Sequence, residues 1–146
     1  MYNEEAYKKT RDAAISLKCP FERALLSRCV DCSGARRLLL AEREAITCTD
    51  PHVNAACRTF HAALHRNALF ALRIDPGERW PFGKEIRAQC GGVLGLKEAL
   101  GHEVSEKTDT AALVTEGLAC YGDIEDFPYS EIMRGVVHYQ PRKRRQ

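Results

Sequence analysis

Five of the seven cysteines of this chain lie between positions 19 and 57, with the spacing C-x9-C-x2-C-x15-C-x8-C. They are Cys19, Cys29, Cys32, Cys48 and Cys57. Residues three apart on a helix or tight turn face the same side, so the sulfurs of Cys29 and Cys32 can reach one metal. The spacing predicts a metal-binding segment over residues 19–57. Cys29 and Cys32 are its expected central ligands, Cys19 and Cys48 the best completion, and Cys57 the leading substitute.

Thiolates of this kind hold either an iron–sulfur cluster or tetrahedral zinc, and two features favour the cluster. Cys19 is followed by Pro20, as a ligand cysteine is followed by proline in the bacterial ferredoxin run C-x2-C-x2-C-x3-C-P, although the run itself is absent. The segment also lacks the second C-x2-C pair of common zinc ribbons. Free cysteine can instead pack as a small buried hydrophobe. We favour that structural role for Cys90 and Cys120, and it stays open for Cys57.

Histidines supply an alternative zinc set. The stretch CRTFHAALH places Cys57, His61 and His65 four residues apart, so they line one side of a helix and would hold zinc with a fourth ligand from elsewhere. HAALH lacks the glutamate of H-E-x-x-H, so a metalloprotease is not indicated. Nucleotide-binding and nucleophile-elbow motifs are also missing from the sequence. An accessory protein is therefore expected rather than an independent enzyme.

Helices are expected to position these ligands, because most of the chain has helical patterning. Asn3 is suited to cap a first helix, and a third helix is expected from about Ala35 to Ile46. Asp50 followed by Pro51 marks the clearest helix start. Later helices are expected on both sides of Gly91-Gly92, from about Thr110 to Tyr121, and after Ser130.

These elements predict an all-α fold, a compact bundle of about five to seven short helices with a cysteine-rich N-terminal half. The stretch RGVVHY is the one segment that also suits a short terminal strand. The glycines of GGVLG are expected to permit a bend or a close approach between helices. With 146 residues, residues 1–141 are expected to form a single helical domain.

Residues 142–146 form a basic C-terminal tail that contains Arg142, Lys143, Arg144 and Arg145. The formal net charge is +2, and removing those four from the 22 basic residues leaves 18 against 20 acidic ones. The remainder is thus slightly acidic, and the tail gives only a weak indication of nucleic-acid binding.

The expected location is the cytoplasm. The N-terminus lacks the apolar core of a signal peptide, and no run of apolar residues is long enough to span a membrane. Disulfides are rare in the cytoplasm, and an odd cysteine count fits a complete disulfide framework poorly. We therefore expect reduced thiols that bind an iron–sulfur cluster for electron transfer, sensing or cluster delivery to a redox partner or larger enzyme complex. The alternatives are a structural-zinc interaction or regulatory module, and a metal-free helical scaffold that binds a protein partner.

Overall fold

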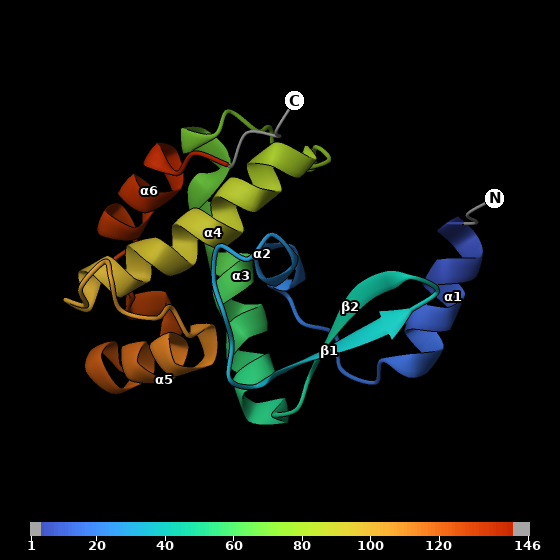
Figure 1. Ribbon diagram of the computed structural model, residues 1–146. Coiled ribbons are helices and arrows are strands. Elements are labelled where there is room, and N and C mark those ends of the chain that lie inside the picture. The colour runs from blue at the N-terminus through green and yellow to red at the C-terminus, as the bar shows by residue number, and fades with distance from the viewer. Residues whose placement is uncertain (1–3, 142–146) are drawn as a thin grey trace.

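The computed structural model describes residues 4–141. Its elements are α1 (Glu4–Ala14), α2 (Glu22–Leu26), β1 (Ala35–Leu40), β2 (Arg43–Cys48), α3 (Pro51–Ala71), α4 (Phe82–Ala99), α5 (Thr110–Tyr121), the 3-10 turn η1 (Ile124–Asp126) and α6 (Tyr129–His138). Figure 1 shows α3 near the centre, with α4 crossing it and with α5 and α6 on the side away from α1. On the other side, α1 and the β1–β2 hairpin form an arm that extends away from the helices.

The helix α3 forms where the sequence predicts it. Asp50 is its N-cap, and one carboxylate oxygen accepts from the amides of His52 at 3.0 Å and Val53 at 3.2 Å. Pro51 occupies the first turn, where its missing N–H costs nothing. One face of α3 is buried in the main hydrophobic core together with α2, α4 and α5. The predicted helix from Thr110 to Tyr121 is likewise confirmed as α5.

Residues 35–48 form an antiparallel hairpin and not the predicted helix, so the all-α prediction is wrong and the fold is mixed α/β. The register pairs Ala35 with Cys48 and Leu40 with Arg43. The connecting residues Ala41 and Glu42 have φ of 47° and 68°, the positive values that a two-residue type I′ hairpin turn needs. Leu, Ala, Arg and Glu favour helix intrinsically, but this propensity is weak enough for tertiary contacts to override it.

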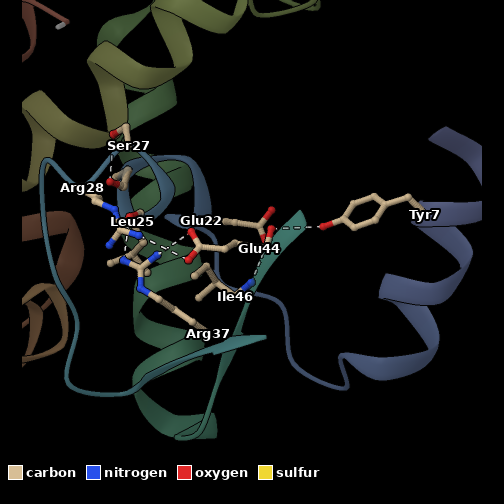
Figure 2. Close-up of polar contacts among 9 residues, drawn as sticks. Tyr7, Glu22, Leu25, Ser27, Arg28, Arg37, Glu44 and Ile46 are labelled. Carbon is tan, nitrogen blue, oxygen red and sulfur yellow. Dashed lines mark hydrogen bonds and ion pairs between the residues drawn. The ribbon is translucent and has the colours of Figure 1, made fainter. Parts of the chain in front are cut away.

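Contacts with the two N-terminal helices supply that tertiary stabilisation (Figure 2). A carboxylate oxygen of Glu22 on α2 accepts from the amide of Ile46 on β2 at 3.2 Å. The guanidinium of Arg37 on β1 donates to the carbonyl of Leu25 at 2.9 Å, and the Tyr7 hydroxyl donates to a backbone carbonyl of β2 at 3.3 Å. Ile46 is fully buried, so its amide requires such a partner. The hairpin is therefore held by both α1 and α2.

The stretch RGVVHY lies in α6 and its C-terminal end, so the predicted terminal strand is also wrong. Helix α6 packs against α4 through glycines. A Cβ added to Gly91 would lie 2.6 Å from the Cα of Val136, and one added to Gly135 would lie 2.6 Å from the carbonyl oxygen of Gly91. The burial of this face against α4 favours helix over strand, and the predicted close approach at GGVLG is confirmed.

Two predictions fall outside the described residues: the helix cap at Asn3 and the basic tail over residues 142–146. Within residues 4–141, no helix combines the length and the apolar character that crossing a membrane requires.

Candidate metal centre

Four of the five clustered cysteines line one small cavity. They are Cys19, Cys32, Cys48 and Cys57. They come from four different places in the chain: the segment before α2, the loop before β1, the end of β2 and the second turn of α3. Phe21, Leu25, Val53, Asn54 and Thr110 are among the residues that complete the wall. Segments far apart in the sequence therefore contribute four thiols to the wall of one cavity.

Backbone pairing brings the segments that carry Cys19 and Cys48 side by side. Lys18 and Thr47 form an antiparallel bridge, and the amide of Cys48 donates to the carbonyl of Leu17 at 2.9 Å. The segment that leads into α2 therefore runs alongside the last residues of β2. This pairing depends on the hairpin, because a helix over the same residues would not present an extended edge.

The loop that carries Cys32 is fixed by the start of α5. The amide of Asp31 donates to the carbonyl of Thr108 at 2.7 Å, and the amide of Thr110 donates to the carbonyl of Asp31 at 2.8 Å. On the other side of the cavity, the side-chain amide of Asn54 on α3 donates to the carbonyl of Lys18 at 2.8 Å. These hydrogen bonds join the elements that surround the four thiols.

Burial disfavours the ionisation of the thiols in this cavity. Burial raises the pKa of the Cys19 and Cys57 thiols to about 12, and it also raises the pKa of Cys32. Repulsion between thiolates adds to these pKa shifts for every pair among these three cysteines and Cys48. A bound cation would have to displace their protons and compensate their negative charge.

The distances between the sulfurs limit which metal group the cysteines could bind. Among the described residues, no three of these thiols bring their sulfurs within 4.8 Å of one another. A single tetrahedral zinc with Zn–S of about 2.3 Å needs sulfurs about 3.8 Å apart, so zinc would have to draw them together. The cavity itself is about 10 Å³, room for one water-sized atom. A multi-iron cluster would therefore enter only if the cysteine side chains rotate outward.

Within the described chain, Asn54 contributes a buried polar atom without a protein partner to the cavity wall. The residue is 1% exposed and lines the cavity, and its Oδ1 has no hydrogen-bond partner among the residues that the structure describes. Buried polar atoms are nearly always paired with protein or an ordered water. A soft four-thiolate donor set suits zinc or an iron–sulfur cluster.

Cys29, predicted as a central ligand, lies elsewhere. It forms a disulfide with Cys90 on α4, with the two Cα atoms 6.0 Å apart. Cys29 and Cys90 are therefore not reduced, contrary to the expectation for this chain. Disulfides persist mainly in oxidising compartments, so the cytoplasmic location stays a prediction. Cys120 is a free, exposed cysteine.

The histidines of the alternative zinc set converge on a glutamate instead of on Cys57. The Nε2 of His61 lies 3.1 Å from one carboxylate oxygen of Glu85, and the Nε2 of His65 lies 2.9 Å from the other. Burial by itself would raise the pKa of Glu85, but hydrogen bonds from both histidines outweigh it and hold that pKa well below its usual range. Gln89, one turn along α4, donates to the same carboxylate at 3.1 Å.

The sequence gave no direct indication that Glu85 belongs to this group. Glu85 lies on α4, after the loop IDPGERWPFG, and so is remote from both histidines in the sequence. The available hint was the histidine pair itself. Two imidazoles at i and i+4 favour a carboxylate partner across the helix interface, but the spacing does not say which one.

Comparisons of the chain with models of known protein families, with curated proteins and with solved structures found no match in any of the three.

Proposed function

We propose that this protein binds an iron–sulfur cluster through Cys19, Cys32, Cys48 and Cys57, and serves in electron transfer, sensing or cluster delivery. The observation that carries the proposal is the cavity that these four thiols share. Cys29 is absent from its wall and bonded to Cys90. Four cysteine thiolates are the common ligand set of such clusters, and the proposal reduces the five predicted ligands to four.

The separation of the sulfurs favours a cluster over a single ion. No three of them lie within 4.8 Å of one another in the described chain, whereas one zinc would need about 3.8 Å between sulfurs. A bound cluster would supply one-electron chemistry. The chain's part is to hold it through four thiolates and to exclude water with apolar neighbours such as Phe21 and Leu25, both 1% exposed.

Structural zinc is the second candidate, and the small size of the cavity favours it. A volume of about 10 Å³ suits one ion more readily than several iron and sulfide atoms. Zinc held by four thiolates would have a closed coordination shell, and its role would be to stabilise an interaction or regulatory module.

The test is anaerobic reconstitution with ferrous iron and sulfide, followed by iron and acid-labile sulfide analysis and an absorption spectrum of the same sample. We expect iron and sulfide in equal amounts, with a visible charge-transfer band that bleaches on reduction. Cys32→Ser should lose most of the iron and the band. The matched control is Cys120→Ser, which changes an exposed cysteine away from the cavity and should retain both.

Other outcomes decide against the cluster. One zinc per chain without sulfide would identify the zinc module. Chelation should then unfold the domain, because structural zinc contributes an apparent ~10–16 kcal/mol to folding in small peptides. Full stability without any metal would favour a metal-free scaffold.

A further inference from the structure

We propose that His61, His65 and Glu85 bind a divalent transition metal ion, best represented by Zn²⁺, at a site separate from the cysteine cavity. Two neutral imidazoles and one carboxylate form a ligand set that suits such an ion and leaves further positions for water. The inference does not depend on the iron–sulfur proposal, because none of these three residues lines that cavity.

Two of the three ligand pairs already have the separation that a metal imposes. Oε2 of Glu85 lies 3.1 Å from Nε2 of His61 and 3.1 Å from Nε2 of His65. Ligand atoms about 2.1 Å from one metal, at angles between octahedral and tetrahedral, lie about 3.0–3.4 Å apart. One ligand atom from each of the three residues falls within 4.8 Å of both others. A small adjustment of the side chains would therefore place an ion between them.

Two helices hold the ligands in place. His61 and His65 are one turn apart on α3, so both rings project from the same side, and their centroids are 4.3 Å apart. Glu85 lies in the first turn of α4, across the interface between the two helices. The site is thus built from the side chains of regular elements and not from a loop.

Neighbouring side chains orient the ligands, as the outer contacts of metal sites do. Gln89 is 4% exposed; its Nε2 donates to Glu85 at 3.1 Å, and its Oε1 accepts from the amide of Ala24 at 3.0 Å. The Trp80 ring stacks on His65 with a centroid separation of 3.8 Å. These contacts fix the carboxylate and one imidazole before any metal arrives.

The site is open enough for an ion to reach it. The side chains of His61 and His65 are 24% and 25% exposed, and that of Glu85 is 13% exposed. Water can therefore occupy the coordination positions that the three residues leave free. Cys57, one turn before His61, faces the cysteine cavity and is not needed as a ligand.

The experiment is a Zn²⁺ titration of the intact chain, followed by the ring ¹⁵N resonances of histidine. This readout separates the site from any zinc bound by cysteines. We expect the His61 and His65 resonances to shift at stoichiometric zinc and to return on chelation. Those of His52 and His138, which are exposed on α3 and α6, should not move. Cys57→Ser should keep the histidine shifts.

The decisive variant is Glu85→Gln, which keeps the shape of the side chain and removes its charge. We expect zinc to bind at least about tenfold more weakly there, as judged by the same resonances, with circular dichroism to verify the fold. His52→Ala is the matched control and should bind as the unmodified chain does. The proposal is overturned if His61 and His65 do not shift at excess zinc, or if Glu85→Gln binds with unchanged affinity; the three residues are then only a structural hydrogen-bond cluster.

Discussion

Cys57 and His61 lie one turn apart on α3, yet their side chains belong to two different groups. Cys57 lines the cavity of four thiols, whereas the Nε2 of His61 lies 3.1 Å from Glu85 on α4. Phe21 contacts both groups, since it lines the cavity and its ring meets that of His61 edge-on at a centroid distance of 5.7 Å. One helix therefore contributes candidate ligands to two sites, with Cys57 at the cavity and His61 and His65 beside Glu85.

The hairpin turn can be tested by Glu42→Gly. Glu42 has a φ of 68°, which glycine adopts without the steric cost that an L side chain carries. We expect the free energy of unfolding, measured by urea denaturation, to rise by about 0.5–1 kcal/mol. Glu42→Ala retains a Cβ and should change little. A loss of about 1 kcal/mol for the glycine variant would instead fit the helix that the sequence predicts.

Removing the disulfide between Cys29 and Cys90 should lower the free energy of unfolding. Cys29 and Cys90 are 61 positions apart, and closing a loop of that size stabilises a fold by about 2–4 kcal/mol. The double variant Cys29→Ala/Cys90→Ala should lose a free energy of unfolding of this size in urea denaturation. Cys120→Ala, at an exposed position, is the control.

Thiol counting checks the same bond directly. The protein unfolded without reductant should present five reactive thiols out of seven cysteines. Seven reactive thiols together with an unchanged unfolding free energy in the double variant would show that the bond does not form. The double variant should still reconstitute a metal centre, because neither residue lines the cavity.

Alkaline pH should destabilise the metal-free protein. The pKa of Cys57 is raised by burial from 9.0 to about 12, so the unfolded chain loses this proton first as the pH rises. Stability that is fully present below pH 9 is therefore lost as the pH approaches 12. Urea denaturation between about pH 8 and 11 should show this decline. Cys57→Ala should show a shallower decline, and an identical slope would contradict the assignment.

Metal loading should have the opposite pH dependence. Binding at the cavity displaces protons from thiols whose pKa is raised, so the apparent affinity should increase with pH. As the pH rises, the stability of the metal-free protein should therefore fall while its affinity for metal increases. Both quantities can be measured on one set of samples.

The elements that the sequence predicted well have local signals. Asp50 and Pro51 mark the start of α3, and the helical pattern of residues 110–121 matches α5. The hairpin had no such signal, because Ala41 and Glu42 stand where asparagine and glycine would normally mark a type I′ turn. Its stability comes from contacts with α1 and α2, which a local pattern does not contain.

The candidate site, too, was only partly predictable from the sequence. The density of cysteines pointed to residues 19–57, but the C-x2-C pair gave Cys29 too much weight. Its partner Cys90 lies 61 positions away, and no local spacing indicates that bond. Glu85 was missed for a similar reason, since it meets the two histidines only when α3 and α4 pack together. Long-range packing, and not residue type, decides which candidate ligands lie together.

The four cavity thiols also divide between two parts of the molecule. Cys19 and Cys48 lie where the arm of α1 and the hairpin joins the rest of the chain, while Cys32 is tied to α5 through Asp31 and Cys57 belongs to α3 (Figure 1). An occupant bound to all four sulfurs would close three covalent loops across this junction, which restricts the chain whether or not it is folded. If this occupant were removed, α1 and the hairpin would gain conformational freedom first. The disulfide would still connect α4 to the loop after α2.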